Sequence, residues 1–123
     1  MYVSGHAHGL LLLRVLCHDI IIASETARFG LPEPKVGLAA LAGGMQRLPR
    51  QIGLKNAMGL LLTGRHIDAK EAYRLGLAQE VTPPADLMTR AMAWAEETAA
   101  CAPLSVRASK EVAMGSLGLP LKD

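Results

Sequence analysis

The stretch Phe29-Gly30-Leu31-Pro32-Glu33 says more about fold and chemistry than any other part of this sequence. Because Pro34 follows, the glutamate stands between two prolines, which predict an extended backbone from Phe29 to Pro34. The stiff backbone lowers the entropy lost when the Glu33 side chain is held in one place. A carboxyl held in apolar surroundings suits general acid–base catalysis. The alternative is an ordinary surface glutamate in a turn.

Upstream of this stretch, Gly5-His6-Ala7-His8-Gly9 precedes an apolar segment, residues 10–17. We expect a turn at residues 5–9 and a buried helix after it. A glycine turn that enters a helix presents free N–H groups at the positive end of the helix dipole, where an oxyanion or a phosphate can bind. Arg14 and Asp19 interrupt the apolar segment well short of the roughly 20 residues that span a bilayer. No basic segment precedes it, as a secretory signal peptide would require.

Short apolar runs in the first third of the chain predict buried strands. Tyr2 and Val3 are expected to end one strand, and the β-branched run Ile20–Ala23 is expected to form another. Glu25–Arg28 suits a turn at the surface. Residues 1–44 are therefore expected to form a core of strands and turns.

Residues 45–123 are predicted to be mostly helical, with one further strand at Ala78–Val81. Pro49 is tolerated only in the first turn of a helix, so the helix after Gly44 should be short or start late. The other expected helices are bounded by typical start and stop residues. One runs over Leu54–Thr63 before Gly64, and a short one runs from Asp68 to Gly76 with Asp68 and Glu71 as a capping box. A long helix is expected from Pro83-Pro84 to just before Pro103, and a last helix from Pro103 to Gly115.

The last two predicted helices each carry an apolar stripe that indicates a buried face. The stripe consists of Met88, Ala91, Met92, Ala95 and Ala99 in the first helix and of Leu104, Ala108 and Val112 in the second. Helices outnumber strands, and the strands are too few for a self-sufficient sheet. The sequence therefore predicts part of an α/β domain.

Composition limits the classes of protein to consider. The 123 residues suit one domain, and 50% hydrophobic with 20% charged residues argues against disorder. A net charge of +2 without a basic patch, and 3% aromatic residues, argue against nucleic acid as a partner. Cys17 and Cys101 form neither a disulfide framework nor a metal pattern, so a reducing cytoplasm is expected.

Two further features leave alternatives open. His6, His8 and His18-Asp19 could supply metal ligands, but the set is incomplete, and we predict no metal site. Gly43-Gly44 either lets the backbone approach a ligand or simply forms a turn.

The order of these segments resembles the enoyl-CoA hydratase/isomerase (crotonase) family, from Val3 to about Val112. The resemblance rests on the glycine turn at residues 5–9 and the Phe29–Glu33 block, and on three later motifs: Gly43-Gly44-Met45-Gln46-Arg47-Leu48, Leu62-Thr63-Gly64-Arg65 and Ala69-Lys70-Glu71-Ala72 with Gly76-Leu77-Ala78. It implies an α/β, partial crotonase-like fold with short buried strands and a helix-rich C-terminal half. We expect one truncated domain, residues 1–123.

The resemblance implies binding of an acyl-CoA thioester, whose carbonyl is polarised by backbone N–H groups while glutamates move protons. Glu33 matches the second acid–base glutamate of the family, and the N–H of Leu10 matches one oxyanion donor. We expect substrate contacts from Ala7, Gly9, Pro32 and Leu41. No metal or redox cofactor is implied, coenzyme A being part of the substrate. Family members form trimers or hexamers, so a homo-oligomer without nucleic-acid or membrane partners is expected.

The sequence departs from the family pattern in two ways. Leu10 and Leu11 replace glycines, and Leu13 stands at the position of the first glutamate, where it cannot transfer a proton. A one-glutamate shift of a double bond, as in the isomerases, is therefore favoured over addition of water.

The second departure is length, because family members are about twice as long. We therefore also consider an inactive relative that acts as an oligomeric or interaction module, and a fragment of a longer enzyme in which Met1 is not the native start.

Overall fold

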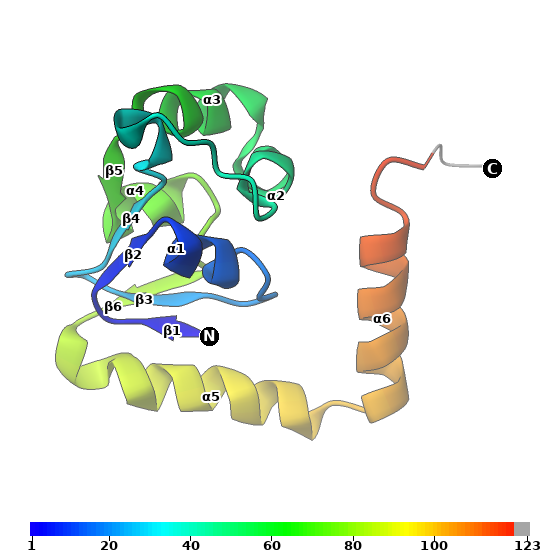
Figure 1. Ribbon diagram of the computed structural model, residues 1–123. Helices are drawn as coiled ribbons and strands as arrows, with labels where there is room; N and C mark the ends of the chain where they lie inside the picture. Colours follow the sequence, from blue (N-terminus) through cyan, green and yellow to red (C-terminus); the bar gives the residue numbers. More distant parts are fainter. Residues whose placement is uncertain (120–123) are drawn as a thin grey trace. The chain divides into compact units, whose positions relative to one another are not determined.

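The computed structural model describes residues 1–119. Its strands form two small sheets of three strands each (Figure 1). In the first sheet, β3 (Ile22–Ser24) lies between β1 (Tyr2–Val3) and β6 (Glu80–Thr82), and all three strands run parallel. The predicted strands at Tyr2-Val3, Ile20–Ala23 and Ala78–Val81 are all present, the last two shifted by one or two residues toward the C-terminus.

The second sheet holds the segments that matter for the site. Strand β4 (Arg28–Gly30) pairs in parallel with β2 (His6–His8) and antiparallel with β5 (His66–Asp68). The predictions were wrong here: residues 5–9 were expected to form a turn, and β5 was not anticipated within a helical region. Both strands are only three residues long, and pairing with β4 stabilises them.

Alternation along these strands separates a buried face from a polar one. Ala7, Phe29 and Ile67 are cross-strand partners, and all three are buried in the hydrophobic core. The residues on either side of them in each strand point to the opposite face, which carries the histidines. The core side of this sheet packs with Leu12 and other buried residues of the first 78 residues.

Four short helices and a 3-10 turn complete the first part of the chain (Figure 1). They are α1 (Leu10–Val15), the 3-10 turn η1 (Glu33–Val36), α2 (Gly44–Ile52), α3 (Leu54–Thr63) and α4 (Ala69–Arg74). Helix α3 ends at Gly64, as predicted, and this glycine has the left-handed φ of 59° that a C-terminal cap requires.

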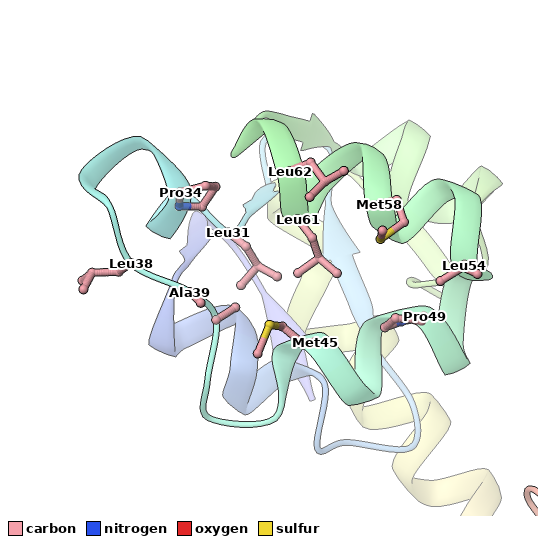
Figure 2. A pocket seen from close by; sticks show the side chains of 11 residues that line it. Leu31, Pro34, Leu38, Ala39, Met45, Pro49, Leu54, Met58, Leu61 and Leu62 are labelled. Carbon is pink, nitrogen blue, oxygen red and sulfur yellow. The ribbon is translucent and has the colours of Figure 1, made fainter.

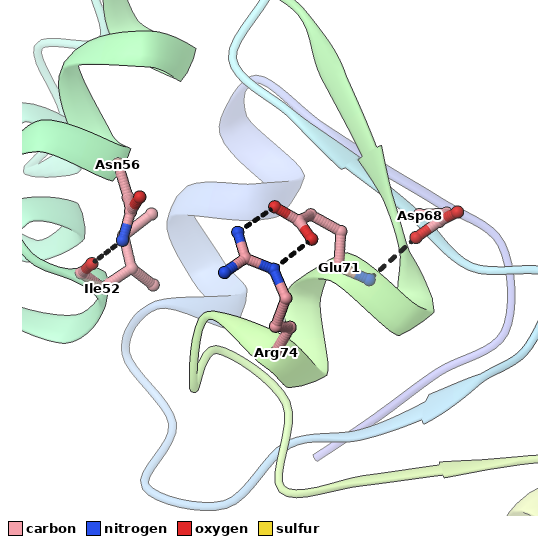
Figure 3. A network of polar contacts seen from close by, with 5 residues as sticks. All are labelled: Ile52, Asn56, Asp68, Glu71 and Arg74. Atoms are coloured by element: carbon pink, nitrogen blue, oxygen red, sulfur yellow. Dashed lines mark hydrogen bonds and ion pairs between the residues drawn. The ribbon is translucent and has the colours of Figure 1, made fainter.

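Helix α4 begins at the predicted cap. The Glu71 N–H donates to the Asp68 carboxylate at 2.8 Å, whereas the Glu71 side chain pairs with Arg74 instead of reaching back to the cap (Figure 3). The hydrogen bond to Arg74 lowers the pKa of Glu71 below its usual value. Only half of the predicted capping box is therefore confirmed, because the Arg74 guanidinium binds the Glu71 carboxylate instead.

Two other local predictions need correction. The segment Phe29–Pro34 is not extended throughout, since η1 begins at Glu33 and includes Pro34. Pro49 was expected in the first turn of any helix, but it lies inside α2, which begins at Gly44 and is short, as predicted, at nine residues. The proline therefore removes one main-chain hydrogen bond from the helix, and packing of the buried Leu48 and Ile52 holds the segment helical instead.

The chain divides into two compact units, Met1–Ala91 and Met92–Asp123. The expectation of one truncated domain over residues 1–123 stays a prediction. After the 3-10 turn η2 (Pro84–Asp86), the remaining helices are α5 (Leu87–Ala100) and α6 (Pro103–Gly115). Helix α6 matches the predicted last helix in extent, whereas α5 begins at Leu87, three residues after the predicted start at Pro83-Pro84, because η2 comes first. None of the helices within residues 1–119 has the length and apolar character needed to cross a membrane.

The apolar stripes of these two helices are exposed in this chain, contrary to prediction. Met88 and Met92 of α5 are about half exposed, and Leu104 of α6 is 79% exposed. Of the residues in α6, none is buried. Helical periodicity indicates which side of a helix is apolar, but it does not indicate whether that side is covered.

Candidate active site around Glu33

Glu33 lies where the chain leaves strand β4, and its carboxyl faces the first turn after strand β2. A Cβ atom placed on Gly9 would lie 3.3 Å from Oε1 of Glu33, so the carboxyl rests against this glycine. The other oxygen, Oε2, is buried, and residues 1–119 offer it no hydrogen-bond partner. The carboxyl therefore turns toward the glycine turn and away from bulk solvent.

The sheet explains this approach. Because β2 and β4 are parallel, their carboxyl ends meet at the same edge, and the Gly9 N–H donates to the Gly30 carbonyl at 3.1 Å. Pro32, with φ of −75°, then turns the chain into η1, whose first residue is Glu33. The two prolines around Glu33 thus set a tight turn, which brings the carboxyl back over Gly9.

The same edge holds the start of α1. Gly9 has a φ of 51°, and its carbonyl accepts the first helical hydrogen bond, from the Leu13 N–H at 3.1 Å. The Leu10 N–H lies in the first turn and therefore has no acceptor within the helix. The Leu10 side chain is 73% exposed, so a leucine is accommodated here without displacing the helix.

Three histidines gather on the polar face of the second sheet. The rings of His8 and His66 have centroids 4.0 Å apart, and those of His6 and His8 are 5.0 Å apart and edge-on. Burial, followed by the proximity of His66 and His6, lowers the pKa of His8. Nε2 of His8 is buried and has no hydrogen-bond partner among residues 1–119.

Sequence reasoning missed His66 and the role of Gly30 beneath it. Gly30 is the cross-strand partner of both His8 and His66, and a Cβ there would overlap the His66 ring. The polar–apolar–polar alternation of His66-Ile67-Asp68 was the signal that could have revealed the strand.

An apolar cavity of about 360 Å³ opens next to the Glu33 turn (Figure 2). Leu31 and Pro34, which flank the glutamate turn, contribute to its wall, and Met45 and Met58 face it from α2 and α3. The remaining lining residues are Leu38, Ala39, Ala40, Pro49, Leu54, Leu61 and Leu62. Such a wall suits a hydrocarbon group.

The other predicted site residues lie in different surroundings. Ala7 is fully buried in the core, which leaves it no surface for a ligand. Leu41 is 75% exposed and is not among the residues that line the cavity. Leu13 is buried against Gly44, where a Cβ would collide with it, so the second glycine of the Gly43-Gly44 pair serves close packing. Among residues 1–119, no cluster of histidine, cysteine and acidic residues could hold a metal ion.

Comparison with known proteins identifies the family of the chain. The family model described as enoyl-CoA hydratase/isomerase matches residues 2–122. The chain belongs to the enoyl-CoA hydratase/isomerase family. Its α/β architecture is accordingly part of the crotonase fold.

Individual relatives show how much of that fold is present. The chain is 44% identical over 120 residues to an (E)-benzylidenesuccinyl-CoA hydratase of Thauera aromatica, covering 98% of this chain and 47% of the relative. It is 44% identical over 122 residues to a probable enoyl-CoA hydratase of Rhizobium meliloti, again covering 98% and 47%. A solved enoyl-CoA hydratase of Mycobacterium marinum superposes with a TM-score of 0.91 at 38% identity, covering 95% of this chain and 48% of that one. The chain therefore spans about half the length of these relatives.

Proposed function

We propose that this chain binds an acyl-CoA thioester and moves a proton along its acyl group, as an isomerase of the enoyl-CoA hydratase/isomerase family would. The Glu33 carboxylate takes a proton from the carbon beside the thioester carbonyl, and the electron pair delocalises onto the carbonyl oxygen. The Leu10 N–H donates a hydrogen bond to that oxygen. Glu33 then returns the proton to a carbon farther along the chain as the double bond moves.

The observation that most strongly supports this proposal is the direction of the Glu33 side chain. Its carboxyl rests against Gly9, one residue before the Leu10 N–H, and one of its oxygens is buried without a partner among residues 1–119. The carboxyl and the N–H group therefore lie at the same sheet edge, which supports a site where one ligand contacts both. The neighbouring cavity offers a place for the hydrocarbon part of the acyl group.

Isomerisation is proposed over hydration because of Leu13. The names of the relatives refer to hydratases, and the family pattern places a glutamate at this position. In this chain the position holds a leucine that is buried in the core. A leucine neither holds a water molecule nor transfers a proton, so Glu33 alone is proposed to move protons. Coenzyme A enters only as part of the substrate.

Turnover of enoyl-CoA thioesters by the 123-residue chain tests this function. We expect a measurable rate for a 3-enoyl-CoA that becomes conjugated, and a 10²- to 10⁴-fold lower rate for Glu33→Gln, which cannot act as a base. Glu25→Gln is the control, because Glu25 is exposed in the turn before β4. Equal rates for the wild-type chain and Glu33→Gln would remove the proposed role of Glu33.

A second candidate function is that of a homo-oligomeric or interaction module without catalysis. It is favoured by the exposed apolar side chains of α6, including Leu104, Val112 and Met114. Apolar side chains exposed in such numbers on one helix favour association with a partner.

A further inference from the structure

The apolar cavity next to the Glu33 turn has both buried and exposed walls. Leu31 and Ala40 are buried, whereas Met45 and Met58 are 38% and 40% exposed and Leu54 is 61% exposed. Every residue that lines the cavity is an aliphatic residue, a proline or a methionine. Apolar side chains that stay exposed around a hollow are typical of a binding site for an apolar ligand.

Helix α3 shows in which direction the cavity extends. Its C-terminal cap, Gly64, lies against the residue before Glu33, since a Cβ on Gly64 would be 3.3 Å from the Cα of Pro32. The lining residues of α3 follow at increasing distance from this contact, in the order Leu62, Leu61, Met58 and Leu54. At a rise of about 1.5 Å per residue, Leu54 lies about 15 Å along the helix from Gly64. Figure 2 shows the same order, with Pro34 toward one end and Leu54 toward the other, so the cavity is elongated and leads away from the Glu33 turn.

The volume of the cavity indicates how much hydrocarbon it can hold. Its 360 Å³ equal the share of about a dozen water molecules in the liquid, at roughly 30 Å³ each. A methylene group is of similar size, so a chain that leaves part of the space open can place about six to eight methylene groups there. Met45 and Met58 have flexible side chains that can adjust to the end of such a chain.

We propose that the cavity binds the far part of an unbranched, medium-length acyl chain, about 8–12 carbon atoms long, and that Met58 and Leu54 set the chain length that is accepted. This inference rests on the proposed function, because it places the thioester end at Glu33. A linear chain suits a cavity that follows one side of a helix. A polar or charged acyl group would lose its hydration against this wall without gaining a hydrogen bond.

Calorimetric titration with butyryl-, octanoyl-, dodecanoyl- and hexadecanoyl-CoA tests the proposal on the 123-residue chain, below the concentrations at which these thioesters form micelles. We expect the affinity to rise about two- to fourfold per methylene group up to octanoyl-CoA and to level off near dodecanoyl-CoA. Met58→Trp fills the middle of the cavity, so its affinities should level off by octanoyl-CoA. Leu54→Trp should reduce only the gain from octanoyl- to dodecanoyl-CoA. Lys55→Trp is the matched control, because Lys55 is exposed on the same helix and does not line the cavity.

The outcomes separate this inference from the proposed function. Equal affinities of the wild-type chain for butyryl- and dodecanoyl-CoA would overturn the inference and leave the turnover test of Glu33 standing. If the affinity rises as expected but no enoyl-CoA is turned over, the placement of the thioester at Glu33 fails with the proposed function, whereas the role of the cavity is supported. A gain that persists in Met58→Trp but is lost in Leu104→Ser would place the chain on the exposed stripe of α6 and would overturn the proposal.

The methionine methyl resonances of the wild-type chain give a second measurement, which decides if Met58→Trp does not fold. The signals of Met45 and Met58 should shift more with dodecanoyl-CoA than with butyryl-CoA. The signal of Met114, which is exposed on α6, should respond equally to both thioesters. Equal shifts of Met45 and Met58 with the two thioesters would contradict the assignment of the cavity.

Discussion

At the residue scale, two glycines shape the candidate site, because their lack of a side chain leaves room for neighbouring polar side chains. A Cβ on Gly9 would lie only 3.3 Å from Oε1 of Glu33 and would press on the carboxyl, and a Cβ on Gly30 would overlap the His66 ring. Gly9 also adopts a φ of 51°, which an L side chain disfavours. The backbones of Gly9 and Gly30 are therefore the surfaces on which these polar side chains lie.

Gly30→Ala tests this dependence on a missing side chain. The added methyl would overlap the His66 ring, so we expect the free energy of unfolding to fall by about 1–3 kcal/mol, as for other overpacked sites. Urea unfolding measures the change. Gly59→Ala in α3 is the control, because nothing lies within 4 Å of its Cβ position, and it should stabilise the chain by up to about 1 kcal/mol.

Combining Gly30→Ala with His66→Ala tests the reason for this loss. In a His66→Ala background, the loss caused by Gly30→Ala should shrink, since the overlapping ring is gone. An unchanged loss in that background would contradict the packing described here.

At the scale of elements, the second sheet joins three short strands, and its polar face collects ionisable groups from all of them. His6, Arg28 and Asp68 form one cross-strand row, and His8 and His66 flank Gly30 in the next. His8 is the group whose pKa is lowered, first by burial and then by His66 and His6. We therefore expect the protonation of His8 to make the stability of the folded chain depend on pH.

We expect the free energy of unfolding to decrease as the pH is lowered from about 7 to 5. Below the ordinary histidine pKa of about 6.5, the unfolded chain takes up a proton at His8 more readily than the folded chain does. The unfolded state then binds more protons, so stability is full above this range and is lost below it. Urea midpoints between pH 5 and 7.5 should fall more steeply for the wild-type chain than for His8→Gln. Parallel curves would show that His8 does not contribute.

At the scale of the whole molecule, the chain carries a packed core in Met1–Ala91 and two long helices whose apolar side chains are largely exposed. Leu104, Ala108 and Val112 lie at helical spacing on α6, and each of them is exposed. An apolar stripe of this kind gains free energy when a partner covers it.

We therefore expect the chain to self-associate, which light scattering after size-exclusion chromatography would report as a mass above that of the monomer. Replacing Leu104 and Val112 together by serine should shift the population toward the monomer, since it removes apolar area from the stripe. Lys110→Gln, an exposed position on the same helix, should leave the mass unchanged. A chain that remains monomeric at high concentration would contradict this expectation and the module function with it.

The sequence by itself determined the features that depend on a few neighbouring residues. The helix Leu54–Thr63 with its end at Gly64, the cap at Asp68 and the last helix after Pro103 were all readable, because glycine, aspartate and proline act within one turn of the backbone. Glu33 was conspicuous for the same local reason, since two prolines flank it.

Only the tertiary structure decided which of these features meet. The contact of Glu33 with Gly9 and the row of His8, Gly30 and His66 depend on strands far apart in the chain, and three-residue strands carry too little pattern to predict their partners. The exposure of the α6 stripe was likewise hidden, because periodicity identifies an apolar side but not what covers it. Strand pairing and burial are properties of neighbours in space, whereas caps and prolines are properties of neighbours in sequence.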